Sequence, residues 1–378
     1  MEEEEENEKL QTGHKAYRFR IYPNAAQRDL FARTFGCCRF IYNRMLSDKI
    51  LHYQECGKML KCTPAGYKKE FPWLKKVDSL ALANVQLDLE GAFNKFFREK
   101  GVGFPKFKAK HRCRRSYTTN MVNGNIRLEA GHLRLPKAGT VKIIVHRRVP
   151  EEYRLKSVTV SQEPSGEYYA SLLYEYCRSE NQAAADPESC SILGIDFAMN
   201  GMAVFSDGSR SDYPGYYRRG EAKLKREQRK LSHCEKGSRN YIRQKKKVAG
   251  CHQKVKNQRK DYHHKLSRRL ADRYQVIAAE DLDLKAMSRS MRYGKSVMDD
   301  GYGQFLNFLA YKLDENGGQL IRIGRFFPSS KTCSCCGAVK KDLKLSERIY
   351  RCGCGCEMDR DVNAAVNIRE EGRRLLCG

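Results

Sequence analysis

The sequence lacks any hydrophobic run that could cross a membrane. None of its segments approaches the roughly 20 apolar residues that a spanning helix needs, although the chain has 378 residues. Residues 2–6 are all glutamate, which is unlike a signal peptide. No internal repeat is visible. These absences predict a soluble, cytoplasmic protein without a membrane partner.

A disulfide framework is also missing. Sixteen cysteines would suggest one in a short secreted chain, but most of them are scattered singly here. We interpret the scattered cysteines as reduced structural thiols. Only residues 333–356 have a cysteine spacing typical of a metal site.

Acidic residues are scarce relative to basic ones. Lysine and arginine total 72 against 45 aspartate and glutamate, which gives a formal net charge of +27. Such an excess makes a polyanionic partner the first hypothesis. A ribosomal-type basic protein and a protein that binds an anionic membrane surface are the alternatives. The length predicts two or three folded units.

The N-terminal half changes from strand-like to helix-like patterns and back. We expect a disordered acidic tail over residues 1–12, a strand over 14–22, and mostly helix from Asn24 to about residue 100. Short strands separated by Gly and Pro then predict a small β-barrel or sandwich, with segments at 125–135, 141–145, 157–161 and 168–176. The polar stretch 179–189 is the best candidate for a linker.

Two basic segments are candidates for contact with nucleic acid. Residues 104–115 interleave cations with aromatic rings, which suits phosphates and stacked bases, although a solvated basic loop explains the pattern equally well. Residues 218–269 hold roughly twenty Lys and Arg, with apolar residues at helical spacing. We predict a long helical hairpin there, whose like charges would repel each other without a polyanion.

Two apolar strands of the C-terminal half are each followed by a carboxylate. The segment 191–195 leads to Asp196 and is predicted to form a hairpin with 202–205, and the segment 274–279 leads to Glu280. A helix over 305–313 and a strand over 320–323 complete this pattern. Because ligands bind at strand ends in open α/β sheets, the two acids can converge on one site.

A third acid, Asp361, begins a predicted helix of small and apolar residues over 361–368. Carboxylates suit phosphodiester hydrolysis, because they hold the Mg²⁺ ions that position the attacking water and the leaving oxygen. Taken singly, each acid is more often a turn residue or a helix cap. Asp359 competes for the third role, and we favour Asp361 because it directly precedes the helix of small residues.

Two cysteine knuckles, at residues 333–337 and 352–356, match a structural zinc ribbon. Cys333 and Cys336 have C-x-x-C spacing and a following glycine. In the second knuckle we prefer Cys352 and Cys354, since a glycine follows Cys354 as well, and Cys356 is then the spare thiol. Whether Cys354 or Cys356 completes the site stays open. A redox-active dithiol is the alternative that four clustered cysteines disfavour.

At these residues the chain resembles the TnpB nucleases of bacterial and archaeal insertion sequences and their relatives, the type V CRISPR effectors. The resemblance covers nearly the whole chain and includes residues 17–23 (YRFRIYP), 73–79 (WLKKVDS) and 104–108 (FPKFK). GID at 194–196 is similar to the first RuvC motif, and EDL at 280–282 to the second. The most specific part runs from SSKTC at 329–333 to DRDVNAA at 359–365, which resembles the zinc element and the third motif.

The resemblance implies a multidomain α+β fold. It comprises a RuvC-like (RNase H-type) α/β nuclease domain over 190–378 with an inserted zinc ribbon at 325–358, a helical recognition domain at 24–111, and a β-barrel wedge domain at 13–23 and 112–180. It also implies an RNA-guided DNA endonuclease that cleaves double-stranded target DNA beside a short flanking motif, with a guide RNA from the transposon end. Asp196 would bridge two Mg²⁺ ions, Glu280 and Asp361 would complete one each, and zinc would be structural.

Several alternatives belong beside this hypothesis. The chain would share its chemistry with a compact type V CRISPR effector, or with a transposase that joins strands. An RNA-guided repressor that binds DNA without cleavage is disfavoured because all three acids are present. A ribosomal zinc-ribbon protein would explain the charge and the cysteines, but it would not explain the three acids. The departures from the family pattern are the C-x-C second knuckle and the glutamates at 2–6. A monomer is expected, with a dimer on one RNA as the alternative.

Overall fold

The computed structural model describes residues 11–178, 190–198, 201–289, 294–344 and 346–377. It divides into two compact units, an N-terminal unit up to Glu180 and a C-terminal unit from Asn181. Each unit has its own hydrophobic core. No helix within the described ranges is long and apolar enough to span a membrane.

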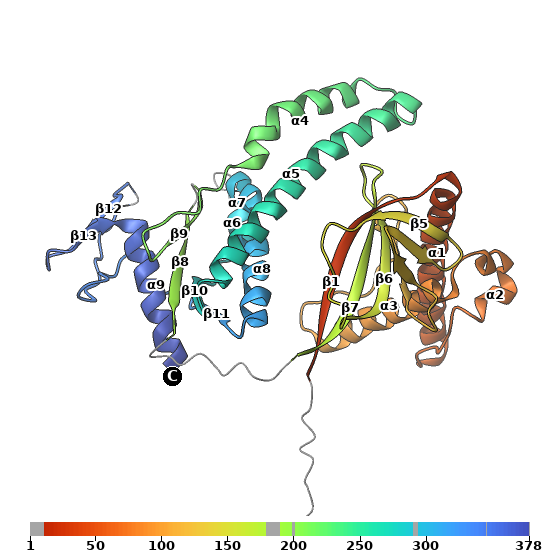
Figure 1. Ribbon diagram of the computed structural model, residues 1–378, viewed down its shortest axis with the longest axis horizontal. Coiled ribbons are helices and arrows are strands. Elements are labelled where there is room, and N and C mark those ends of the chain that lie inside the picture. The colour runs from red at the N-terminus through yellow and green to blue at the C-terminus, as the bar shows by residue number, and fades with distance from the viewer. Residues whose placement is uncertain (1–10, 179–189, 199–200, 290–293, 345, 378) are drawn as a thin grey trace, which may run out of the picture. The chain divides into compact units, whose positions relative to one another are not determined.

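A seven-stranded antiparallel sheet forms the centre of the N-terminal unit (Figure 1). Its longest pairing joins β1 to β7, from Gln11 opposite Arg178 to Ile21 opposite Tyr168. The order of strands across the sheet is β2-β6-β7-β1-β5-β4-β3. Their bounds are Gln11–Tyr22 (β1), Arg115–Asn120 (β2), Arg127–Glu129 (β3), His132–Leu135 (β4), Gly139–Ile144 (β5), Arg154–Gln162 (β6) and Tyr168–Arg178 (β7).

Helices pack against this sheet and share its core. The long helix α1 starts where the sequence predicts it, because Asn24 and Gln27 form a reciprocal capping box. It ends at Gly57, whose φ of 68° is a conformation that glycine adopts without strain. The helices of this unit are α1 (Ala25–Cys56), α2 (Tyr67–Glu70), the 3-10 helix η1 (Pro72–Lys76) and α3 (Ser79–Arg98).

The N-terminal unit departs from the expectation in three places. Strand β2 was not predicted, because its residues alternate without a strong apolar signal. The seven strands form a sheet with β2 and β3 at its edges, and no pairing among the described residues closes it into a barrel. The strand β1 already begins at Gln11, so residues 11 and 12 do not belong to the predicted tail. Residues 1–10 of that tail and the predicted linker 179–189 lie outside the described residues.

The C-terminal unit contains a four-stranded mixed sheet with the order β11-β10-β8-β9. The strands β8, β10 and β11 are parallel, and β9 pairs antiparallel with β8 as the predicted hairpin requires. Residues 199 and 200 of its turn are not described. The bounds are Ile192–Ala198 (β8), Met202–Phe205 (β9), Val276–Glu280 (β10) and Gln319–Ile323 (β11).

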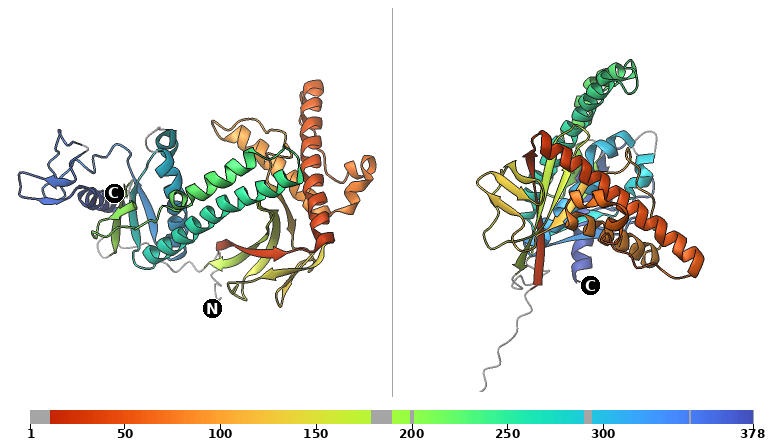
Figure 2. Two further views of the ribbon diagram at one scale, coloured as in Figure 1. Left: turned by 90° about the horizontal axis from the view of Figure 1, so that it is seen from above. Right: turned by 90° about the vertical axis from the view of Figure 1, so that its right-hand side faces the viewer.

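Helices cover both faces of this sheet (Figure 1). One face packs on α8 and the C-terminal part of α5, and the other packs on α9. The helix pair α4 and α5 is the predicted basic hairpin, and its distal part extends beyond the sheet (Figure 2). The bounds are Tyr216–Ser232 (α4), Arg239–Ala271 (α5), Leu284–Arg289 (α6), Gly294–Asp300 (α7), Tyr302–Glu315 (α8) and Arg360–Cys377 (α9).

Candidate functional site: a carboxylate site and a thiol site

Two of the predicted acids lie side by side at one end of the sheet. In the parallel pairing of β8 with β10, Ile195 is opposite Ala279. Asp196 and Glu280 are the residues that follow, so they occupy equivalent positions on neighbouring strands. Both side chains are half-buried. The apolar runs before them are buried in the sheet, which fixes the position of both acids. Glu280 is the last residue of β10, and Asp196 lies two residues before the end of β8.

Helix α9 brings the third acid to the same end. It lies so close to the sheet that a Cβ on Gly194 would collide with the carbonyl oxygen of Ala365, and a Cβ on Gly372 would collide with Ala278. Glycine at both positions therefore permits direct backbone packing of α9 on β8 and β10. Asp361 lies in the first turn of α9. We call Asp196, Glu280 and Asp361 the carboxylate site.

The competing acid, Asp359, has a structural role. Its Oδ1 accepts hydrogen bonds from the backbone N–H of Asp361 at 3.0 Å and of Val362 at 3.2 Å, which caps α9. Its other oxygen, Oδ2, forms an ion pair with Arg210 at 2.9 Å. Asp359 is therefore the helix cap, and Asp361 is the acid of the two that does not cap α9.

The electrostatics of the carboxylate site favour a cation. Burial raises the pKa of Asp196 well above its usual range, the negative charges of Glu280 and Asp361 raise it further, and Arg360 opposes them. Burial also raises the pKa of Glu280, while the hydroxyl of Ser329, which donates to Glu280 Oε1 at 2.6 Å, lowers it. Desolvated like charges repel each other, so a bound divalent cation would relieve the repulsion. The donor set therefore fits Mg²⁺, which prefers carboxylate oxygens.

The three carboxylates are nevertheless not drawn into a tight cluster. Among the residues that the structure describes, only cysteines form groups of three or more candidate ligands whose ligand atoms all lie within 4.8 Å of one another. The acids converge on one end of the sheet through their backbone positions and interact electrostatically. The carboxylate site is thus more open than a closed structural metal site.

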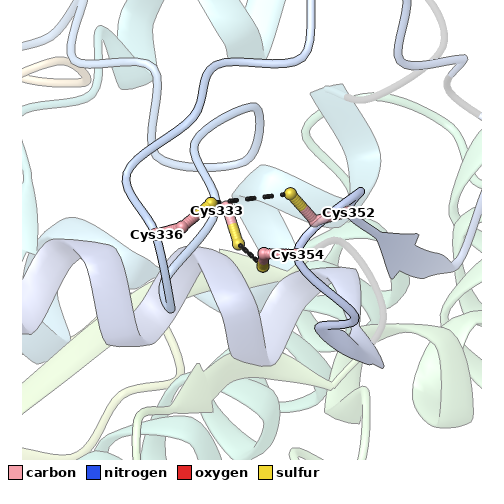
Figure 3. A group of neighbouring side chains, drawn as sticks. All are labelled: Cys333, Cys336, Cys352 and Cys354. Atoms are coloured by element: carbon pink, nitrogen blue, oxygen red, sulfur yellow. Dashed lines mark hydrogen bonds between the residues drawn. The ribbon is translucent and has the colours of Figure 1, made fainter.

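Four of the clustered cysteines are those chosen from the sequence: Cys333, Cys336, Cys352 and Cys354 (Figure 3). The Sγ atoms of Cys333 and Cys354 are 3.7 Å apart, and those of Cys336 and Cys352 are 3.6 Å apart. Four thiolates around one tetrahedral zinc, with Zn–S bonds of about 2.3 Å, would have sulfurs roughly 3.8 Å apart. The sulfurs therefore already lie at the spacing of a zinc site, and we call this group the thiol site.

Backbone N–H groups and two short strands shape the thiol site. Burial raises the pKa of Cys333, but hydrogen bonds from the N–H groups of Cys336 and Cys335 and from neighbouring thiols outweigh it and lower this pKa to about 6. The lowered pKa favours the thiolate, which is the form that binds zinc. The second knuckle is held between the short strands β12 (Ile349–Arg351) and β13 (Glu357–Asp359), around the buried ring of Tyr350.

Side chains that the sequence analysis did not single out connect the two sites. Asn363 accepts from the N–H of Ser334 at 3.0 Å and donates to the carbonyl of Thr332 at 2.7 Å. Asn367 donates to the carbonyls of Ser329 and Thr332, both at 2.7 Å. These two asparagines, one turn apart on α9, fix the segment that carries both Ser329 and the first knuckle. Their spacing of four residues in the sequence was the available signal.

Three family models match successive parts of the chain. One described as "Helix-turn-helix domain" matches residues 13–58, one described as "Probable transposase" matches 170–291, and one described as "Cas12f1-like, TNB domain" matches 302–368. In this structure residues 13–58 contain β1 and the single long helix α1. The third match contains all four cysteines of the thiol site.

Whole-chain relatives define the class of protein. A protein of Streptomyces pristinaespiralis named "Putative RNA-guided DNA endonuclease" is 32% identical, with 98% of this chain and 92% of that protein covered. One of Escherichia coli strain K12, "Putative RNA-guided DNA endonuclease InsQ", is 31% identical, with 96% and 94% covered.

The fold agrees with these relatives. The Cas12f1 chain in a complex with guide RNA and target DNA has a TM-score of 0.59 at 14% identity, and the match covers 95% of this chain and 99% of that one. This chain has a mixed α+β fold that resembles the Cas12f1 chain, and it carries a cysteine cluster in its C-terminal unit. The chain belongs to the TnpB family.

Proposed function

We propose that the protein is an RNA-guided DNA endonuclease that cleaves target DNA at the carboxylate site. The observation that carries the proposal is the placement of Asp196 and Glu280 at equivalent positions on the neighbouring parallel strands β8 and β10, with Asp361 in the first turn of the helix packed across them. Three acids at one end of a sheet, in a protein with a large positive charge, fit the hydrolysis of a nucleic acid.

Each acid has a distinct part in this proposal. Asp196, whose pKa is raised by burial and by the charges of both other acids, would take part in holding both Mg²⁺ ions, and Glu280 and Asp361 would hold one each. Two such ions supply charge neutralisation at the scissile phosphate and a nucleophilic water at neutral pH. The hydroxyl of Ser329 donates a hydrogen bond to Glu280, which opposes the rise in the pKa of that carboxyl caused by burial and fixes its orientation.

The remaining surface fits guide and target binding. The hairpin of α4 and α5 carries many lysines and arginines over its whole length and few acids. Such a surface grips phosphates without reading bases, which suits a protein that leaves sequence choice to base pairing. We propose that residues 24–111 serve as the recognition domain, that 13–23 and 112–180 form the wedge domain, and that 190–378 form the RuvC-like nuclease domain with its zinc element at 325–358.

The partners follow from the same proposal. The relatives are named as RNA-guided DNA endonucleases, and the Cas12f1 structure contains guide RNA and target DNA. For this chain we propose a guide RNA transcribed from the end of its transposon and a double-stranded target that carries a short flanking motif.

The test is co-expression of the chain with its flanking genomic DNA, followed by sequencing of the RNA that copurifies. A plasmid library that matches this RNA beside randomised flanks is then incubated with the complex and Mg²⁺. Guided cleavage that EDTA abolishes supports the proposal and yields the flanking motif. A specific RNA without cleavage would replace it with the repressor hypothesis, and the absence of any specific RNA would overturn guiding.

A further inference from the structure

Two cysteines beside the thiol site are not used by it. Cys335 lies in the first knuckle and is exposed, and Cys356 is the last residue of the second knuckle and is buried. Together with Cys333 they form a second group whose three sulfur atoms all lie within 4.8 Å of one another. Cys333 belongs to both groups, so the two sets of thiols meet at one buried sulfur.

The backbone holds these thiols in place. The N–H of Gly337 donates to the carbonyl of Cys333 at 2.9 Å, which closes the first knuckle around Cys335. The N–H of Cys352 donates to the carbonyl of Cys356 at 2.9 Å, and Gly355 between them has a φ of +90°, which favours glycine. The convergence of Cys335 and Cys356 on Cys333 therefore follows from the same turns that build the thiol site.

The spacing suits a metal ion. Three sulfurs bound to one thiophilic ion lie roughly 4 Å apart, given metal–sulfur bonds of about 2.3 Å. Sulfurs that are already within 4.8 Å need only small side-chain movements to reach that spacing. A disulfide between Cys335 and Cys356 would require the two sulfurs to approach to about 2.05 Å, a larger change.

The charge balance also permits a second ion. Four thiolates around one Zn²⁺ carry a net negative charge, and two further thiolates with one further divalent ion leave that charge unchanged. A shared thiolate that bonds to both ions lets Cys333 serve both groups at once. Thiolate ligands select soft ions such as Zn²⁺ over Mg²⁺, so this site would not compete for the ions of the carboxylate site.

We propose that Cys333, Cys335 and Cys356 bind a second zinc ion, fused to the thiol site through the sulfur of Cys333. Solvent supplies the fourth ligand, because Cys335 opens to the surface. Each thiol that is protonated before binding releases its proton to the solvent. An ion with an open position exchanges faster than the ion of the closed four-thiolate site. The inference does not depend on the nuclease activity.

The test is metal counting on the full-length protein, purified under reducing conditions and equilibrated with excess Zn²⁺ before removal of free metal. Native mass spectrometry and elemental analysis should give two zinc ions per chain for the wild type. Cys335→Ser should give one. Because the side chain of Cys335 is exposed, we expect this variant to keep the wild-type fold, which circular dichroism checks. Cys56→Ser, an exposed cysteine of α1 in the N-terminal unit, is the matched control and should keep two.

A second measurement tests the shared sulfur. The protein loaded with ¹¹³Cd²⁺ should give two cadmium resonances that are spin-coupled through the thiolate of Cys333, and Cys356→Ser should leave one. Two uncoupled resonances would overturn the fused arrangement. One zinc ion in the wild type, unchanged in Cys335→Ser, would overturn the second site and leave the thiol site intact. A wild type without zinc would overturn both.

Discussion

The carboxylate site and the thiol site of the C-terminal unit are built in opposite ways. The four sulfurs of the thiol site already lie at zinc spacing, held by tight knuckles. The three acids share one end of a sheet, but their oxygens are not gathered into a group of that tightness. A structural ion is part of the fold and needs a closed cage, whereas a catalytic ion needs room for water and substrate. The difference in geometry agrees with the proposed roles, a structural ion at the thiol site and a catalytic ion at the carboxylate site.

The sharpest test of this distinction uses two neighbouring acids on α9. We expect Asp361→Asn to reduce guided cleavage by at least about 100-fold, since it removes a charge that would hold the catalytic ion. Asp359→Asn should leave cleavage within a few-fold, because asparagine also caps helices. Both variants should retain zinc. Cleavage rates measured on equal amounts of complex distinguish the two variants. If both variants lose cleavage activity equally, the basis for choosing Asp361 over Asp359 is removed.

Loss of the thiol site should act through folding. Cys336→Ser removes one of four zinc ligands, and zinc binding supplies on the order of 10 kcal/mol of folding free energy in small zinc modules. We expect loss of zinc from the thiol site and rapid proteolysis within residues 325–358, together with loss of cleavage. Bound zinc and limited proteolysis measure this, with Cys56→Ser as the control. A variant that cuts normally without zinc at this site would show that the two sites are independent.

The asparagine link between the sites should have a smaller effect. Asn367→Ala removes the donors to the carbonyls of Ser329 and Thr332. The loss should lower the stability of the C-terminal unit by about 1–3 kcal/mol, because a buried acceptor is left unpaired. Thermal unfolding of the purified protein measures it, with the exposed Asn257→Ala of α5 as the control. Equal melting temperatures for both variants would argue against the link.

The smallest expected change concerns Ser329. Its hydroxyl donates a hydrogen bond to Glu280, which lowers the pKa of that carboxyl. The Ser329→Ala substitution should therefore raise the pKa of Glu280. More alkaline conditions are then needed to ionise Glu280, and the acid limb of the pH profile of cleavage should move to higher pH. The rate at neutral pH should fall about tenfold. Ser330→Ala, one residue further on, is the control, and an unshifted profile in Ser329→Ala would contradict this role.

Much of the C-terminal unit could be predicted from the sequence because its signals are local. The apolar runs before Asp196 and Glu280 predicted strands that end in acids, and the structure contains β8 and β10 there. Strand β10 ends at Glu280 as predicted, whereas β8 continues past Asp196 to Ala198, where it pairs with β9. The basic hairpin and α9 were also predicted from local patterns and are present. A buried parallel strand needs a continuous apolar run, so its pattern is visible without knowledge of its partners.

The parts that could not be predicted depend on distant partners. Strand β2 has a weak pattern of its own and is defined by its pairing with β6, from Arg115 opposite Gln162 to Asn120 opposite Ser157. The open order of the N-terminal sheet and the short helices α6 and α7 were missed for the same reason. The bonds of Asn367 reach carbonyls 35 and 38 residues away, which spacing alone does not reveal.

In the proposed mechanism the carboxylate site cuts DNA and does not hold the guide or the target. The Asp196→Asn variant, assembled with the copurifying RNA, separates these functions when target binding and Mg²⁺-dependent cleavage are measured on the same preparation. Wild type and Asp207→Asn, which changes an exposed acid in the turn after β9, are measured beside it. We expect Asp196→Asn to retain RNA and to bind target DNA as the wild type does but to leave it uncut, while Asp207→Asn cuts normally. Cleavage by Asp196→Asn, or its loss of RNA, would show that Asp196 does not have the proposed role.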